Sequence, residues 1–434
     1  MKPVKVGICG LGTVGSGTFN VLQRNGEEIA RRLGRELVIE QVGARRDNPA
    51  CNLSDTSITR DIFEVAKNPA VDIVVELIGG YDTAKELVLT AIQHGKHVVT
   101  ANKALIAEHG NEIFAAAAEK GVIVAYEAAV AGGIPVIKAI REGLAANRIN
   151  TIAGIINGTG NFILTAMAKE KREFADVLAE AQALGYAEAD PTFDVEGIDA
   201  AHKLTILASI AFGVPLQFKS AYTEGISQIT PEDLAHAKEL GYQIKHLGIA
   251  RRKPGGIELR VHPTLIPDTK LIAKVDGVMN AVMVDADAVG PTMYYGPGAG
   301  AEPTASAVIA DIVDVARSID SVSSVVAPLA FHSEAIDDTK ILDIEEVESA
   351  YYLRMQAADH PGVMANITRI LSDLNINIEA INQKEVPEGE QFADIFMLTR
   401  EVREKDMKAA IEAIQALADV SGSVVTIRMD HLGH

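Results

Sequence analysis

The sequence predicts an α/β protein made of three units. Short apolar runs alternate with helical patterns near the N-terminus, which indicates a doubly wound parallel sheet. Strand and helix patterns then mix, which indicates an α+β unit, and the last elements follow the order βαββαβ of a ferredoxin-like fold. The expected boundaries are 1–134, completed by about 303–335, then 135–302, and finally 349–430.

Composition excludes several classes of partner. The 434 residues carry a formal net charge of −19, which argues against binding to a nucleic-acid backbone or an anionic membrane. Cys9 and Cys51 are too few for a disulfide framework and fit a reducing compartment. The N-terminal residues enter a strand pattern without a signal-type apolar core, and no apolar run is long enough to span a membrane. We expect a cytoplasmic protein.

The first strand, Val4–Cys9, is almost wholly apolar, as a buried parallel strand requires. It runs directly into a glycine-rich turn, and a helical pattern follows from Val14 to Leu22. A GxGxxG motif alone is weak evidence, but a strand before it and a helix after it are typical of a Rossmann-like dinucleotide site. The residues expected at the cofactor are Gly10, Gly12, Thr13, Val14 and Gly15.

The second strand, Leu37–Ala44, ends in Arg45-Arg46 rather than in the acidic residue that binds a free ribose 2′-hydroxyl. An arginine at this place suits a 2′-phosphate, so the sequence favours NADP, with NAD as the other possibility. The alternative is that both arginines are simply solvated at a strand end.

Further buried strands are expected at Val71–Leu77, His97–Thr100 and Val122–Tyr126, with helices at Thr83–His94 and Asn111–Lys120 between them. Ligands bind beyond the carboxyl ends of such strands. Lys103 follows one of these ends, so a ligand contact competes with an ordinary loop lysine.

A small-residue turn from Glu127 to Ile134 precedes a helix expected from Pro135 to about Leu144. Carbonyl oxygens with one carboxylate nearby can hold a hard cation. From the residues alone, a tight glycine turn is the better interpretation.

The middle unit is expected to begin with a strand at Ile149–Ile156, followed by Asn157 to Asn161 at the start of a helix. That polar strand end suits a small polar substrate, although most Asn-Gly pairs are turns. Strands are also expected at Gln243–Arg251 and Ile257–Thr264. A glycine-rich loop, Tyr294 to Ser306, leads into a helix from about Pro303 to Arg317, and it either connects elements or lies against the cofactor.

The stretch from Ala181 to Lys203 carries the chemistry. Pro191 interrupts a loop that contains Glu188, Asp190 and Asp194, and a helical pattern starts after Gly197. Asp199 and Lys203 are four residues apart on one helical face, which is most often a weak surface pair. Here the helix is apolar nearly all round, so the pair should face an internal cavity in which a lysine pKa can be tuned for proton transfer.

These residues resemble a known family. The positions Ala181, Gly185, Tyr186, Ala187, Asp190-Pro191, Asp194-Val195, Gly197, Asp199 and Lys203 match the signature of homoserine dehydrogenase at every spacing, and the resemblance extends over the whole chain. It implies reversible NAD(P)H-dependent reduction of L-aspartate 4-semialdehyde to L-homoserine, in threonine, methionine and isoleucine biosynthesis.

The resemblance also implies roles for single residues. Lys203 would be the general acid and base, with Asp199 holding its ammonium and Lys103 near cofactor and substrate. Substrate binding would involve Glu188, Asp199, Asn157, Gly158 and Thr159. A monovalent cation, sodium, would bind Glu127 and the carbonyls of Val130, Gly132 and Ile134. The loop with Gly300 and Glu302 would close over the nicotinamide. The assembly would be a homodimer or homotetramer.

The C-terminal unit resembles an ACT domain, an amino-acid-sensing module. Strands are expected at Tyr351–Ala357, Ile376–Gln383, Asp394–Thr399 and Ser423–Arg428, with helices at Val363–Leu374 and Lys405–Ala418. An effector, threonine of the same pathway, would bind Asp359, Gly362, Val363 and Asn377. A purely structural appendage is the alternative.

Two rival functions remain. A semialdehyde dehydrogenase that makes an acyl phosphate needs a nucleophilic cysteine, and neither Cys9 nor Cys51 lies beside the expected substrate region. A catalytically silent sensor of a dinucleotide and an amino acid would not require the Asp199–Lys203 pair.

Overall fold

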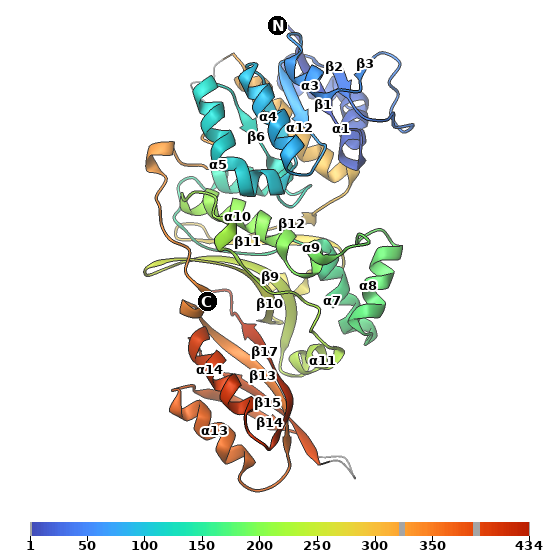
Figure 1. Cartoon of the computed structure of the whole chain (residues 1–434). Helices are drawn as coiled ribbons and strands as arrows, with labels where there is room; N and C mark the ends of the chain where they lie inside the picture. The colour runs from blue at the N-terminus through green and yellow to red at the C-terminus, as the bar shows by residue number, and fades with distance from the viewer. Residues whose placement is uncertain (1, 321–325, 385–390, 434) are drawn as a thin grey trace.

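The computed structural model describes residues 2–320, 326–384 and 391–433. Three units follow one another along the molecule: an N-terminal unit at the top of Figure 1, a middle unit and a C-terminal unit at the bottom. Within the described residues, no helix is both long and apolar enough to cross a membrane.

The N-terminal unit is a six-stranded sheet with the order β3-β2-β1-β4-β5-β6. Every strand pair is parallel, so the doubly wound prediction is confirmed. The order reverses beside β1, where such folds bind their ligands. The strands are β1 (Val4–Cys9), β2 (Leu37–Gly43), β3 (Ser57–Thr59), β4 (Ile73–Glu76), β5 (His97–Thr100) and β6 (Val124–Ala125); the helices are α1 (Thr13–Arg24), α2 (Gly26–Leu33), α3 (Ile62–Lys67), α4 (Asp82–Gln93) and α5 (Lys103–Lys120).

The chain returns to this unit late in the sequence. Helix α12 (Ala301–Ser318) packs against α1, and its Val308 and Ile312 share a core with Val6 and Phe19. Gly17 of α1 permits this approach, because a Cβ there would stand 2.5 Å from the carbonyl oxygen of Ala301.

The middle unit begins after the turn Glu127–Ala129 with α6 (Val136–Lys138) and a π-helical turn (Ala139–Gly143), where one helix was expected. Its other elements are β7 (Ile149–Ile155), α7 (Gly158–Glu170), α8 (Phe174–Ala183), α9 (Thr192–Val195), α10 (Ile198–Phe212), η3 (Phe218–Ser220), β8 (Tyr222–Thr223), α11 (Pro231–Glu239), β9 (Tyr242–Lys253), β10 (Gly256–Pro267), η4 (Leu271–Lys274), β11 (Met279–Ala286) and β12 (Gly290–Pro297).

The hairpin of β11 and β12 corrects the sequence prediction. Tyr294–Pro297 was expected in a loop, but it pairs with Met279–Val282 of β11. Gly290, Pro291, Gly296 and Pro297 punctuate β12, which is tolerated because β12 lies at the edge of its sheet.

The C-terminal unit consists of β13 (Glu348–Ala358), α13 (Val363–Asp373), β14 (Ile378–Gln383), β15 (Phe392–Thr399), β16 (Val402–Arg403), α14 (Glu404–Gln415) and β17 (Val420–Met429). The order βαββαβ is confirmed, with the short β16 added. Alternate residues of β13 face opposite sides, as a strand requires. Tyr351, Leu353 and Met355 pack under α13 and α14, whereas Ala350 and Tyr352 pack against the middle unit.

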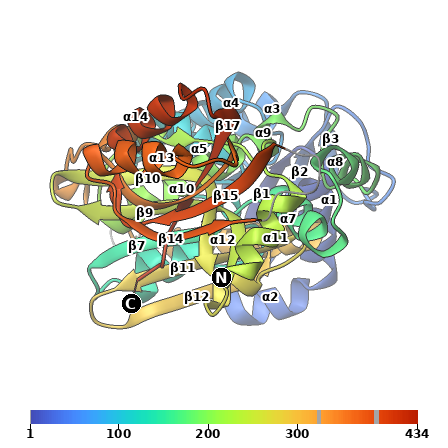
Figure 2. The same ribbon diagram turned by 90° about the horizontal axis from the view of Figure 1, so that it is seen from below.

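The two sheets are continuous, although the middle unit was expected to have a sheet of its own. Parallel pairing of Thr264–Leu265 in β10 with Arg428–Met429 in β17 joins them into one 11-stranded sheet. Figure 1 shows β9, β10, β17, β13, β15 and β14 following one another towards the bottom of the molecule, and Figure 2 shows α13 and α14 on one side of β14 and β15. The C-terminal unit is therefore built onto the middle unit.

Candidate functional site

Two helices from different units meet where the lysines were expected. Helix α5 of the N-terminal unit packs against α10 of the middle unit. Lys103 is the first residue of α5, whose N-cap is the side chain of Asn102, and Asp199 and Lys203 lie in the first turns of α10. Helix α10 is buried nearly all round, as its sequence predicts, and starts at Gly197 with φ 81°. Lys203 and Asp199 thus meet inside the molecule.

Asp199 is the centre of this site and is 5% exposed. Its Oδ2 lies 2.7 Å from Nζ of Lys203, and its Oδ1 lies 2.9 Å from Nζ of Lys103. Lys203 also donates to the carbonyl oxygen of Ile156 at 2.7 Å. The structure therefore brings all three residues together, with one carboxylate between two ammonium groups.

Asn157 holds the carboxylates in place. Its Nδ2 donates to Oδ2 of Asp199 and to Oδ1 of Asp194, both at 2.8 Å. Its Oδ1 accepts from the backbone N–H of Gly160 and caps α7, which explains an asparagine at this strand end.

The pKa values of Lys203 and Lys103 shift in opposite directions. Burial would raise the pKa of Asp199, but Lys203 and Lys103 together bring it well below its usual range. Burial lowers the pKa of Lys203 despite Asp199, whereas Asp199 raises the pKa of Lys103 despite partial burial. Burial raises the pKa of the nearby Asp194. Lys203 is thus the better proton donor of the two lysines near neutral pH.

The other expected substrate residues lie at the start of α7 and on the loop that Thr159 contacts. Thr159 donates to the carbonyl oxygen of Tyr186 at 2.7 Å and so ties the loop containing Glu188 to the start of α7. Glu188 itself is exposed. Gly158 lies where a Cβ would be 2.7 Å from the carbonyl oxygen of Val278, so no larger residue fits.

The glycine turn after β1 fits a dinucleotide. Gly10 has φ 103°, and a Cβ on Gly15 would stand 2.0 Å from the Gly10 carbonyl oxygen, so both glycines allow a tight turn. A Cβ on Gly12 would meet no atom within 4 Å, which leaves open space beside the turn. No described side chain caps α1, and its first turn, with Thr13 and Val14, has no acidic residue. These conditions suit a pyrophosphate.

The predicted cofactor residues Arg45 and Glu302 are in different environments: Arg45 is exposed, whereas Glu302 is paired with an arginine. Arg45 and Arg46 are exposed beyond the carboxyl end of β2, as a contact to a 2′ group requires. Glu302 instead binds Arg24 of α1, with oxygens 2.7 Å and 3.2 Å from the two guanidinium nitrogens. Gly300, with φ 119°, is the N-cap of α12. In this structure, Glu302 ties α12 to α1.

The turn expected to hold a cation has a buried carboxylate. Oε1 and Oε2 of Glu127 accept from the backbone N–H groups of Ile137 at 2.9 Å and Lys138 at 2.8 Å, and burial raises the pKa of Glu127 to about 7. Ala131 and Gly132 have φ 54° and 42°. A carboxylate offers about four acceptor positions, so acceptor capacity remains for a cation.

Neither thiol is placed for nucleophilic chemistry. Cys9 is fully buried in β1, and burial followed by Glu76 raises its pKa strongly. Burial also raises the pKa of Cys51. This geometry removes the support for the acyl-phosphate rival.

Three site residues were not predicted. Glu76 at the end of β4 accepts from Thr100 Oγ1 at 2.6 Å and from the N–H groups of Ile78 and Gly79, which shapes the turn before α4. His202 and Glu108 lie on α10 and α5 beside the lysine site. A glutamate ending an apolar strand was a visible signal for Glu76; the other two residues meet only in three dimensions.

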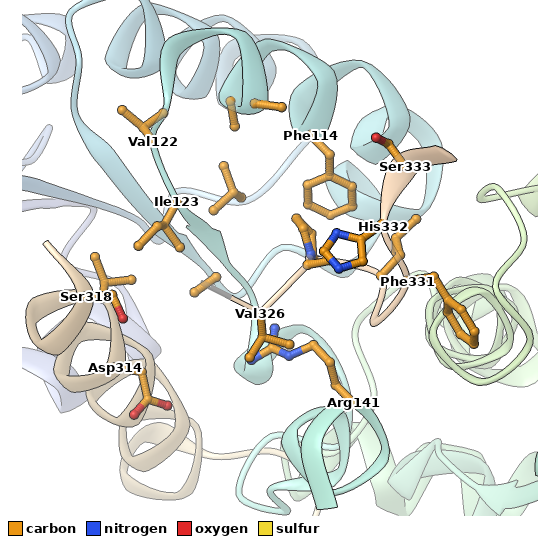
Figure 3. A pocket seen from close by; sticks show the side chains of 18 of the residues that line it. Phe114, Val122, Ile123, Arg141, Asp314, Ser318, Val326, Phe331, His332 and Ser333 are labelled. Carbon is orange, nitrogen blue, oxygen red and sulfur yellow. The ribbon is translucent and has the colours of Figure 1, made fainter. Parts of the chain in front are cut away.

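A separate cavity of about 600 Å³ lies between α5, β6, α12 and the segment 326–336. Figure 3 shows Phe114, Val122, Ile123 and Val326 around it, with Arg141 and Asp314 at one side. None of the residues predicted for catalysis lines it, so we place the chemistry at Asp199 and not here.

The predicted effector residues do not all meet. Asp359, Gly362 and Val363 lie together at the turn before α13, where Gly362 is the N-cap with φ 102°. Asn377 was expected opposite them, but it precedes Ile378, which pairs with Thr399, whereas Ala358 pairs with Phe392. Phe392 and Thr399 are seven residue steps apart along β15, roughly 24 Å at about 3.4 Å per step. Gln383 is the residue of β14 that reaches Asp359, at 3.0 Å.

Comparison with known proteins agrees with this architecture. Three family models match: the NAD-binding domain of homoserine dehydrogenase over residues 10–127, homoserine dehydrogenase over 135–313 and the ACT domain over 351–419. A homoserine dehydrogenase of Pseudomonas aeruginosa is 68% identical over 433 residues, with 100% of both chains covered.

Solved structures give the same result. The crystal structure of a homoserine dehydrogenase from Thiobacillus denitrificans is 60% identical, with a TM-score of 0.95 over 100% of this chain and 99% of that one. A hyperthermophilic archaeal homoserine dehydrogenase in complex with NADPH is 26% identical, with a TM-score of 0.62 over 72% of this chain and 98% of that one. The agreement in sequence, domain order and fold shows that this chain belongs to the homoserine dehydrogenase family, with an NAD-binding domain and a C-terminal ACT domain.

Proposed function

We propose that this protein reversibly reduces L-aspartate 4-semialdehyde to L-homoserine with NADPH, in the biosynthesis of threonine, methionine and isoleucine. The observation that carries the proposal is the buried Asp199 carboxylate, 2.7 Å from Lys203 and 2.9 Å from Lys103. A silent sensor would have no use for this costly cluster of buried charges.

The dinucleotide, when bound, supplies the hydride in reduction and accepts it in oxidation. Lys203 donates a proton to the oxygen of the substrate aldehyde as the C4–H bond forms, and takes a proton from the hydroxyl in the reverse direction. Its lowered pKa supports this role. Lys103, which stays charged, polarises and positions the same oxygen.

The remaining polar groups bind the rest of the substrate. Glu188 binds its α-ammonium group, because this carboxylate is exposed on the loop that Thr159 ties to the site. Asn157, Gly158 and Thr159 line the strand end where α7 begins, and Asn157 keeps Asp199 oriented.

Arg45 would favour NADP by binding the 2′-phosphate. Its exposed position beyond β2 supports this preference, and the archaeal relative was solved with NADPH. Gly300 and Glu302 would border the nicotinamide from the loop before α12. Sodium would bind Glu127 and the carbonyls of Val130, Gly132 and Ile134.

The ACT domain would bind threonine and inhibit the enzyme. Asp359, Gly362 and Val363 offer a carboxylate and backbone N–H groups to a zwitterion, and Gln383 replaces Asn377 as their neighbour on β14. The protein would be a homodimer or homotetramer, and the edge strand β12, with Tyr295 55% exposed, is a surface available for pairing.

One assay tests the activity. Initial rates of homoserine oxidation are measured by nicotinamide absorbance with NADP and with NAD, with and without threonine. Reduction of NADP that depends on homoserine supports the proposal. A protein that binds dinucleotide but forms no NADPH would be the silent sensor.

A further inference from the structure

The lysine site depends on how the N-terminal and middle units dock. Lys103 belongs to the first unit and Asp199 to the second, so their 2.9 Å contact spans the boundary. The side chain of Lys103 is long and 39% exposed, and an ion pair of this kind is a weak restraint by itself.

A second contact crosses the same boundary between the same two helices. Nε2 of His202 on α10 lies 3.5 Å from Oε1 of Glu108 on α5. His202 is the residue directly before Lys203 in the sequence, and Glu108 lies five positions after Lys103. The two contacts therefore share both helices.

His202 is better fixed than Lys103. Its ring is 1% exposed and stacks on Phe218, with centroids 4.1 Å apart and an angle of 28° between the planes. Phe193 of α9 is the second aromatic neighbour, at 6.3 Å. A stacked, buried ring has little freedom to move, so its position relative to Glu108 follows the docking of the helices.

The polar atoms of His202 need a partner. Within the described residues, neither ring nitrogen has a partner within hydrogen-bond geometry, and a buried unpaired donor is costly. Burial lowers the pKa of His202, and Glu108 and Asp199 oppose this shift. The ring carries an N–H in either tautomer, so it has a hydrogen to donate. Glu108, whose Oε1 lies 3.5 Å from Nε2 of the ring, is the acceptor placed to take this hydrogen.

We propose that the contact between Glu108 and His202 positions Lys103 against Asp199 across the boundary of the two units. His202 is a positioning residue: it acts through Lys103 and does not touch the substrate. The proposal rests on the dehydrogenase activity proposed above.

Two substitutions of His202 separate hydrogen bonding from packing. His202→Phe keeps a stacking ring and loses the donor, whereas His202→Gln keeps an N–H donor and loses the ring. We expect His202→Phe and Glu108→Ala to lower kcat about tenfold with an unchanged KM for NADPH, and His202→Gln to lower it less. If His202→Phe is normal and His202→Gln is impaired, the ring serves packing only and the proposal is wrong.

Matched controls make the test specific. Glu112→Ala removes another α5 carboxylate, whose partner Lys85, 2.7 Å away, lies within the N-terminal unit; we expect normal turnover. Adding His202→Phe to the Lys103→Ala variant should lower kcat no further. If His202→Phe lowers kcat as much in the Lys103→Ala variant as in the wild type, positioning through Lys103 is refuted. Equal falls in kcat for Glu112→Ala and Glu108→Ala would also refute it.

Unfolding measurements test the contact between Glu108 and His202 without relying on enzyme activity. If the wild-type protein does not oxidise homoserine, the proposed function fails. The contact is still decided by urea midpoints of Glu108→Ala, His202→Phe and the double variant. A double shift smaller than the sum of the single shifts supports the contact, and strict additivity rejects it.

Discussion

Replacing Lys203 with methionine should remove the proton transfer and spare the fold. Methionine keeps an unbranched side chain of similar length in the buried helix. Asp199 is not left unpaired, because Lys103 at 2.9 Å and Asn157 at 2.8 Å remain. We expect kcat to fall at least ~100-fold, which is ~2.7 kcal/mol of barrier. The glycine turn after β1 is untouched, so the KM for the cofactor should stay constant.

The assay compares initial rates of homoserine oxidation for Lys203→Met, the wild type and Lys169→Met. Lys169 is a fair control because it is 63% exposed and pairs with Asp276 at 2.9 Å, away from Asp199. Burial lowers the pKa of Lys203 from 10.5, so wild-type oxidation, which needs the neutral amine, should rise with pH and level off below that value. A Lys203→Met variant with near-normal kcat would refute the assignment.

Three further predictions concern the cofactor, acid stability and regulation. Arg45→Ala should weaken NADPH binding by about 1.5–3 kcal/mol and NADH binding much less; equal losses in a fluorescence titration would show that Arg45 does not bind the 2′-phosphate. Burial lowers the pKa of His246 from 6.5 to about 4, so the unfolded chain binds a proton in this window while the native ring does not, and stability falls as the pH drops through it. His246→Gln should lose less stability over this range than the wild type, by on the order of 3 kcal/mol in urea unfolding, and parallel curves would contradict this reasoning. Asp359→Ala should leave uninhibited rates unchanged and weaken any threonine inhibition, whereas Asn377→Ala should not; inhibition curves measure both, and the reverse result would place the effector at the other end of β14.

Local patterns predicted most elements of the fold. β1 and β5 have the predicted bounds, because short apolar runs between turn residues leave few alternatives. Helix α10 was predictable from its apolar surface and the glycines at both ends. The β11–β12 hairpin was missed because its glycines and prolines indicate a loop, and only its place at a sheet edge makes them acceptable.

The site was predictable to the extent that it lies within one segment. Asp199 and Lys203 share a helix, so their spacing predicts their contact. Lys103 could be placed at a strand end, but its partner is 96 positions away (199 − 103), and only the packing of α5 on α10 brings them together. Asn377 was misplaced although the strand order could have placed it: β13 and β14 both run antiparallel to β15, so they are parallel to each other, as strands joined by a helix are. The start of β14 therefore lies away from the turn that follows β13.

The junction of β10 and β17 has a consequence for synthesis on the ribosome. Arg260 in β10 is 1% exposed and has two carboxylate partners, the neighbouring Glu258 at 3.1 Å and the distant Asp430 at 3.3 Å. The ribosome adds Asp430 170 residues after Arg260. At a synthesis rate of about 5–20 residues per second, Asp430 and the strand that pairs with β10 are made on the order of 10–30 s after Arg260. During that time the edge of β10 is unpaired and the guanidinium of Arg260 lacks its second carboxylate. Chaperone binding to the nascent chain should therefore persist until β17 has left the exit tunnel.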